Sequence, residues 1–220
     1  FGTFVLLEAA RDAGIRHLQI STDEVYGSID EGSFTEASPI VPSSPYSASK
    51  AGGDLIVGAF RHTYGSDVLI ARASNNYGPR QHGDPIPVYG DGSQVRNWLF
   101  VRDFCTAIER ILAEGEAGLV YNVGGPDELP NIEVVRTILE LTGRDESLIT
   151  HVGDRLGHDV RYSLGSDRTE GLGWKAAVGF REGIARTVDW YRENEAWWGS
   201  LRSGEYREYY QRQYGQTLSG

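Results

Sequence analysis

The chain has 220 residues, a net charge of −10 at pH 7 and 40% hydrophobic residues. A chain of this length can bury a sizeable core, and its acidic balance argues against a surface that neutralises nucleic-acid phosphates. No apolar run approaches the ~20 residues that span a bilayer, and a single cysteine excludes an internal disulfide. We therefore expect a cytoplasmic protein that binds neither nucleic acid nor membrane.

Short buried strands alternate with helices along the chain. Turn and capping residues predict elements over 4–13 (helix, ended by Gly14), 16–22 (strand), 45–64 (helix, capped by Ser44), 68–73 (strand), 103–114 (helix), 119–123 (strand), 131–142 (helix, capped by Asn131) and 181–194 (helix). Residues 27–44 and 75–79 are predicted loops, and Cys105 is predicted to be a buried apolar residue. The alternation is typical of an α/β fold with a parallel sheet, whose ligands bind beyond the carboxyl ends of the strands.

Tyr46 and Lys50 lie four residues apart on a predicted helix, so they share one helical face. A nearby ammonium favours the phenolate, so Tyr46 could act as a base while Lys50 binds a ribose hydroxyl. This spacing is also common in unrelated helices. Its position after a strand that ends in Ser21-Thr22 is what favours nicotinamide redox chemistry.

Asp23 and Glu24 leave the end of that strand. Acidic residues in loops are usually only solvated, but neighbouring side chains at a strand end point in different directions. Each carboxyl can then take its own role on one substrate, as the loss of water next to a carbonyl requires.

Several motifs together resemble those of one enzyme family. They are S-T-D-E-V-Y-G (21–27), S-P-Y-S-A-S-K-A-G (44–52), S-N-N-Y-G-P (74–79), P-V-Y-G-D-G-x-x-V-R-N-W (87–98), Y-N-V-G-G (121–125) and D-R-L-G-H-D-x-R-Y (154–162). In order and spacing they are similar to the dTDP-glucose 4,6-dehydratases of the extended short-chain dehydrogenase/reductase superfamily. The resemblance covers nearly the whole chain. It implies a Rossmann-like doubly wound parallel sheet with a smaller C-terminal α/β subdomain that binds the sugar nucleotide.

The resemblance also implies NAD as cofactor and dTDP-glucose as substrate. Tyr46, with Lys50, would take the proton of the glucose 4-hydroxyl while C4 is oxidised, and Thr22 would orient that oxygen. Glu24 would remove the C5 proton and Asp23 would protonate the departing C6 hydroxyl. The product would be the 4-keto-6-deoxy sugar nucleotide, after reduction at C6.

Binding roles follow from the same resemblance, residue by residue. Ser21, Tyr46, Lys50 and Asn75 would contact the cofactor. The substrate would contact Asn75, Tyr89, Arg96, Asn122, Arg155 and His158, with Tyr89 stacking near the thymine and the two arginines neutralising the diphosphate. Without the resemblance, each of these residues has an ordinary structural explanation. The sequence contains no metal motif.

Two features depart from the family pattern. The Gly-rich turn that holds the NAD pyrophosphate is absent, and the segment between Gln81 and Gly83 is short. We expect a natural protein that is longer by roughly one βαβαβ half. Within this chain we expect residues 1–80 and 100–123 to form the C-terminal half of an NAD-binding domain. Residues 81–99 and 124–220 would form the substrate-binding subdomain.

Two alternatives remain at the level of the sequence. One is a neighbouring nucleotide-sugar enzyme, either a 4-epimerase or a dehydratase for a UDP-sugar, although the Asp23-Glu24 pair disfavours an epimerase. The other is a truncated, non-catalytic sugar-nucleotide-binding module. The resemblance also implies a homodimer in which helices 4–13 and 45–64 pair with their copies. The product could feed cell-wall rhamnose or another deoxysugar.

Overall fold

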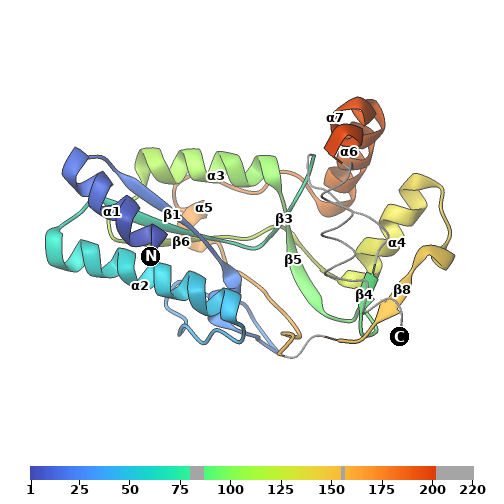
Figure 1. Cartoon of the computed structure of the whole chain (residues 1–220), viewed down its shortest axis with the longest axis horizontal. Coiled ribbons are helices and arrows are strands. Elements are labelled where there is room, and N and C mark those ends of the chain that lie inside the picture. The colour runs from blue at the N-terminus through green and yellow to red at the C-terminus, as the bar shows by residue number, and fades with distance from the viewer. Residues whose placement is uncertain (80–86, 155–156, 202–220) are drawn as a thin grey trace.

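A computed structural model describes residues 1–79, 87–154 and 157–201 of the chain. Figure 1 shows two parts that lie side by side. One part is a small parallel sheet between layers of helices, and the other is a smaller cluster of strands and helices. Within the described residues, no helix combines the length and the apolar character needed to cross a membrane.

The first part is a three-stranded parallel sheet with the order β1-β2-β6. Its elements are β1 (His17–Thr22), β2 (Val68–Ala73), β6 (Val120–Val123), α1 (Gly2–Ala13), α2 (Pro45–Tyr64) and α3 (Val101–Glu114). Helices α1 and α2 cover one face of the sheet and α3 covers the other (Figure 1). A parallel sheet with helices on both faces confirms the doubly wound α/β class.

The burial pattern of β2 explains this arrangement. Every residue of β2 is buried, as expected for a strand that is covered on both faces. Val68 and Ile70 join the apolar cluster of α1 and α2, whereas Leu69 and Ala71 join the cluster of α3. Because side chains alternate across a strand, Arg72 continues the face that is covered by α2.

Helix boundaries in this part follow the predicted signals. Gly14 and Gly65 end α1 and α2 in the left-handed conformation, with φ near 65° in both cases. At the start of α2, Ser44 and Ser47 form a reciprocal capping box, and Pro45 occupies the first helical position. The predicted bounds of α2 and β2 are confirmed.

The second part contains two small sheets, with the orders β3-β5-β7 and β4-β8. Its elements are β3 (Asn75–Tyr77), β4 (Pro87–Tyr89), β5 (Val95–Phe100), β7 (Asp127–Pro130), α4 (Asn131–Thr142), η2 (Glu146–Leu148), β8 (Thr150–Val152), α6 (Phe180–Glu193) and α7 (Glu195–Leu201). A short helix, α5 (Asp167–Glu170), packs on β6 of the first part. Aromatic residues fill the core between α6 and the β3-β5-β7 sheet, where Tyr77 contacts Trp98, Phe100 and Phe180.

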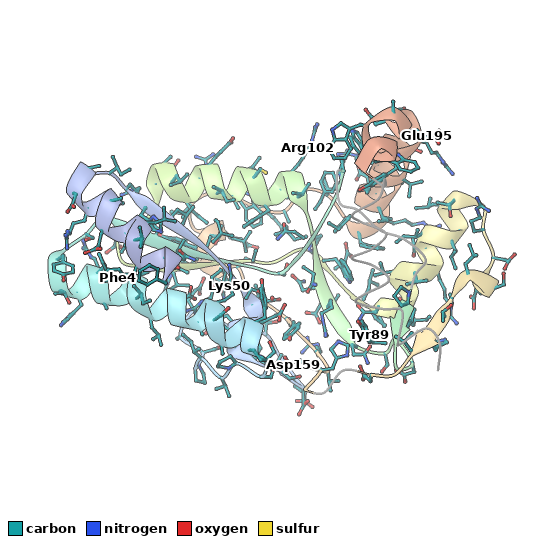
Figure 2. The ribbon with its side chains drawn as sticks, viewed as in Figure 1. Phe4, Lys50, Tyr89, Arg102, Asp159 and Glu195 are labelled. Atoms are coloured by element: carbon teal, nitrogen blue, oxygen red, sulfur yellow. The ribbon has the colours of Figure 1, made fainter. Side chains whose placement is uncertain are left out.

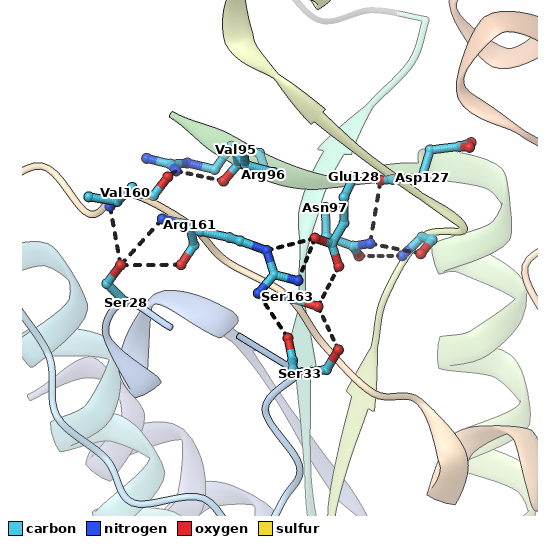
Figure 3. Close-up of polar contacts among 12 residues, drawn as sticks. Ser28, Ser33, Val95, Arg96, Asn97, Asp127, Glu128, Val160, Arg161 and Ser163 are labelled. Atoms are coloured by element: carbon cyan, nitrogen blue, oxygen red, sulfur yellow. Dashed lines mark hydrogen bonds and ion pairs between the residues drawn. The ribbon is translucent and has the colours of Figure 1, made fainter. Parts of the chain in front are cut away.

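A polar seam joins the two parts (Figure 3). Arg161 forms an ion pair with Glu128 of β7, and its Nη1 donates to the carbonyl of Gly32 at 2.9 Å. The Ser33 and Ser163 hydroxyls are 2.7 Å apart, and Ser163 also donates to Glu128. The loop that follows β1 is thereby fixed to the second part.

Three local predictions differ from the structure. Cys105 is exposed, because the buried stripe of α3 runs through Phe104, Ala107 and Ile111 and leaves the neighbouring position outside. Residues 75–77 form strand β3 in place of a loop, since they pair in parallel with β5. Asn131 is the first helical residue of α4 and Pro130 is its N-cap.

Candidate active site

The predicted catalytic carboxyls lie on η1 (Asp23–Tyr26), a single 3-10 turn that directly follows β1. Thr22 caps this turn: its hydroxyl accepts from the Glu24 amide at 3.3 Å and donates to Asp23 Oδ1 at 3.2 Å. Gly27 ends the turn with φ of 84°, where an added Cβ would lie 2.5 Å from the Val41 carbonyl oxygen. The backbone at both ends therefore defines where the two carboxyls lie.

The two carboxyls have different environments. Asp23 is 2% exposed, and its second oxygen has no hydrogen-bond partner among the described residues. Burial, and then the charge of Glu24, raises the pKa of Asp23 to about 7. Glu24 is half-buried. A carboxyl that holds its proton near neutral pH beside a second, more accessible carboxyl is the arrangement that an acid–base pair requires.

Tyr46 and Lys50 lie on α2, close to this turn. The Tyr46 side chain is 54% exposed, and the Lys50 Nζ donates to the carbonyl of Ile20 at 2.8 Å. In this arrangement the pKa of Tyr46 is not lowered, and its activation by Lys50 stays a prediction. Burial raises the pKa of Tyr46, and the charges of Glu24 and Asp23 raise it further. The Tyr46 phenol therefore lies close enough to both carboxyls to interact with their charges.

Arg96 of β5 brings a buried positive charge to the same site. It is 5% exposed, and burial lowers its pKa, while the charges of Asp23 and Glu24 act in the opposite direction. Its Nη1 donates to the Val95 carbonyl at 2.8 Å and its Nη2 to the Asp159 carbonyl at 2.9 Å. Carbonyl oxygens do not cancel the charge, so the guanidinium remains suited to an anion.

Unpartnered polar atoms line the carboxyl ends of β1 and β2. Among the described residues, the hydroxyls of Ser21 and Ser74 and the side-chain oxygen of Asn76 are buried without a hydrogen-bond partner. Asn75, which was predicted to contact the cofactor and the sugar, is half-buried in the same segment. Buried polar atoms normally have partners, so these positions fit a polar ligand such as a nicotinamide amide or a sugar hydroxyl.

Tyr89 and His158 also meet in the second part. Their rings are 6.1 Å apart in an edge-to-face arrangement, and His158 Nδ1 is 2.6 Å from Asp154 Oδ1. Figure 2 shows Tyr89 on this part and Lys50 on the first part, with Asp159 between them. Arg155 lies outside the described residues, as does the short segment between Gln81 and Gly83.

Asn122 does not join these residues. It lies within β6 and is fully buried, with its Oδ1 accepting from the Tyr26 hydroxyl at 2.8 Å and its Nδ2 donating to the Phe34 carbonyl at 3.4 Å. Both polar groups of its side chain are therefore used inside the protein. The strand directs that side chain toward η1 and the loop after it, and its contact with the substrate stays a prediction.

Sequence reasoning missed several residues around the site. Ser74 and Asn76 flank the predicted Asn75, and their place at a strand end was the available signal. Tyr162 and Asp159 surround Arg96: the guanidinium lies 4.4 Å from the Tyr162 ring centroid, and the Tyr162 hydroxyl donates to Asp159 at 2.5 Å. These contacts are tertiary and have no signal in local spacing.

Comparisons with known proteins identify relatives of the chain. The family model described as GDP-mannose 4,6 dehydratase matches residues 1–187. A dTDP-glucose 4,6-dehydratase of Xanthomonas campestris pv. campestris is 47% identical, over 94% of this chain and 69% of that protein. A protein of the same name from Streptomyces niveus is 48% identical, over 92% of this chain and 65% of that one. The chain thus spans about two thirds of the length of these relatives.

Solved structures with a similar fold include a dehydratase and an epimerase. The dTDP-glucose 4,6-dehydratase of Streptomyces venezuelae, solved with NAD bound, has a TM-score of 0.87 and 49% identity over 91% of this chain and 67% of that one. A UDP-glucose 4-epimerase of Thermus thermophilus, in complex with NAD, has a TM-score of 0.81 and 31% identity over 88% of this chain and 69% of that one.

Proposed function

The chain belongs to the GDP-mannose 4,6 dehydratase family, and from this premise we propose that the protein is an NAD-dependent dTDP-glucose 4,6-dehydratase. It would be a hydro-lyase that converts dTDP-glucose into dTDP-4-keto-6-deoxyglucose and water. The observation that carries the proposal is the pairing of a buried Asp23, whose pKa is raised to about 7, with the more accessible Glu24. An epimerase has no step that needs such an acid and base.

Each catalytic side chain would move one proton. Tyr46 would accept the proton of the 4-hydroxyl, and the ammonium of Lys50 would stabilise the resulting phenolate. The resulting C4 carbonyl acidifies C5, whose proton Glu24 removes. Asp23 donates its proton to the C6 oxygen, which leaves as water. Thr22 would orient the 4-oxygen by exchanging its present bond to Asp23 for one to the sugar.

Cofactor binding is supported by the unpartnered polar atoms at the strand ends. NAD, when bound, supplies the oxidation at C4 and the reduction at C6, and Glu24 would return a proton to C5 as C6 is reduced. Ser21 and Asn75 would hold its nicotinamide end, and Lys50 and Tyr46 would contact its ribose. We propose that residues 1–80 and 100–123 form the part of the protein that holds this end of the cofactor.

Substrate binding would use residues 81–99 and 124–220, which include most strands and helices of the second part. Arg96 offers a buried guanidinium to the diphosphate, supported by Arg155, and Asn75 would contact the sugar. Tyr89 and His158 offer two rings to the base. The same groups can receive a UDP-sugar, so a UDP-glucose dehydratase is the second candidate.

We also propose a homodimer in the cytoplasm that supplies a deoxysugar such as rhamnose. Exposed apolar side chains on α1 and α2 support the dimer, since Leu6 is 60% exposed and Leu55 is 65% exposed. Sedimentation of the purified protein tests this assembly. A monomer at micromolar concentration would refute it.

The proposed reaction is tested by incubating the purified protein with NAD and dTDP-glucose, and separately with UDP-glucose. We expect the 4-keto-6-deoxy product from dTDP-glucose, detected by its absorbance in alkali and by mass spectrometry as a loss of water. Tyr46→Phe is the matched negative control, because it keeps the ring and removes the base. Absence of product, or product only from UDP-glucose, would overturn the substrate assignment.

A further inference from the structure

A buried chain of hydrogen bonds lies beneath the catalytic turn. Arg72 of β2 is 4% exposed; its Nε donates to Asp54 Oδ2 and its Nη1 to the Tyr26 hydroxyl, both at 2.8 Å. The Tyr26 hydroxyl donates in turn to Asn122 Oδ1 at 2.8 Å, and Asn122 donates to the Phe34 carbonyl. From Arg72 through Tyr26 to Asn122 the bonds run in one direction, which favours mutual polarisation of these members.

The Tyr26 ring is held as firmly as its hydroxyl. The ring stacks on Phe34 with centroids 5.0 Å apart, and the Arg72 guanidinium lies 4.8 Å from the Tyr26 centroid. Burial raises the pKa of Tyr26, so the phenol stays protonated, as its donation to Asn122 requires. The side chain is therefore fixed at both its ring and its hydroxyl.

This series of hydrogen bonds connects the two elements that carry the proposed catalytic groups. Tyr26 is the last residue of η1, the same 3-10 turn that contains Asp23 and Glu24. Asp54 follows Lys50 by four residues on α2 and Tyr46 by eight, so the three share one helical face. Arg72 bonds to both Tyr26 and Asp54 and thus bridges the turn and the helix.

We propose that Arg72 and Tyr26 are positioning residues, which hold the Asp23–Glu24 turn at a fixed distance from the Tyr46–Lys50 helix. This inference rests on the proposed function and extends it to residues that touch neither substrate nor cofactor. A buried ion pair adds little net stability compared with apolar residues of similar volume, so what this pair contributes is geometry. Proton transfers at C4, C5 and C6 of one sugar need the turn and the helix at fixed positions relative to each other. Misplacement by about 1 Å can cost a hundredfold in rate.

The test compares Tyr26→Phe with Tyr121→Phe. Both tyrosines are 2% exposed, and Tyr121, which precedes Asn122 on β6, also uses its hydroxyl in a hydrogen bond, to the Glu116 amide. Tyr26→Phe keeps the ring stack and removes only the two hydroxyl bonds. We expect kcat for dTDP-glucose to fall about ten- to a hundredfold in Tyr26→Phe with KM within about twofold. Tyr121→Phe should leave both constants within about twofold of wild type.

Hydrogen–deuterium exchange of the backbone amides provides a readout that is independent of activity. Tyr26→Phe should accelerate exchange in residues 22–27, and Asp54→Asn should accelerate it in residues 46–54, whereas Tyr121→Phe should change neither segment. Three outcomes would overturn the proposal. The two Phe variants could lose kcat equally, or the loss in Tyr26→Phe could match its fall in folded fraction. Exchange in residues 22–27 could also stay unchanged in Tyr26→Phe. If the wild-type protein makes no product, the proposed function fails, and the exchange comparison still decides the positioning role.

Discussion

The guanidinium of Arg96 and the carboxyl of Asp23 are electrostatically coupled inside the protein. Each is at most 5% exposed, and each acts on the pKa of the other: Arg96 lowers that of Asp23, and Asp23 raises that of Arg96. Burial dominates at Asp23, so its pKa stays raised to about 7 in spite of the arginine. A residue proposed to bind the diphosphate therefore also tunes the proposed acid.

Replacing this arginine should change both binding and pH dependence. Arg96→Gln removes the charge that lowers the pKa of Asp23, so Asp23 keeps its proton to higher pH. If Asp23 is the acid, kcat of the wild type should fall on the alkaline side of about pH 7, and we expect this fall to move to higher pH in Arg96→Gln. KM for dTDP-glucose should rise at least about tenfold. Profiles of kcat from about pH 5 to 9 test this expectation. A shift of this alkaline fall of kcat to lower pH would contradict the electrostatic coupling between Arg96 and Asp23.

Asp23 should also make folding stability depend on pH. Its folded-state pKa of about 7 lies above the ordinary value of 3.8, so the folded state binds the proton more tightly. The stabilisation from that proton is complete below pH 3.8, declines as pH rises, and is lost above pH 7. We expect Asp23→Asn to stabilise the protein more at about pH 8 than at about pH 5, by about 2 kcal/mol. Urea unfolding of both proteins at each pH measures the difference, and equal effects at the two pH values would contradict the raised pKa.

Glu24→Gln should separate the first step from the second. The amide cannot accept the C5 proton, whereas Tyr46 is unchanged, so oxidation at C4 should proceed and water loss should stall. We expect kcat to fall at least about a thousandfold and solvent deuterium not to enter C5, as followed by NMR of the recovered sugar nucleotide. Asp23→Asn is the matched control, because it should slow water loss while C5 exchange continues. Exchange at C5 in Glu24→Gln would contradict the role of Glu24.

Local signals in the sequence predict the helices and strands of the first part, but not the short strands of the second part or the contacts between elements. The capping box at Ser44 and the glycine that follows α2 predict both ends of that helix, because they act within one turn. By contrast, no local pattern shows that the side-chain oxygen of Asn122 accepts a hydrogen bond from Tyr26, 96 residues away. The raised pKa of Tyr46 is missed for the same reason, since it depends on burial and on carboxyls of another element.

Gly125 should be one of the positions in the chain least tolerant of a side chain. Its backbone lies against β5, where a Cβ would be 1.7 Å from the Trp98 carbonyl oxygen, a contact that only movement of the backbone could relieve. The Gly125 amide also donates to Asn97 Oδ1 at 2.6 Å, so such movement would break this hydrogen bond. We expect Gly125→Ala to lower the free energy of unfolding by at least about 2 kcal/mol.

The matched control is Gly58→Ala in α2, where the glycine is exposed and an added Cβ meets no atom within 4 Å. Alanine is the better helix former, so this variant should gain about 0.5–1 kcal/mol. Urea unfolding measures both variants, and their opposite signs separate a steric clash from a general response to added methyl groups. A Gly125→Ala protein as stable as the wild type would contradict the close approach of this turn to β5.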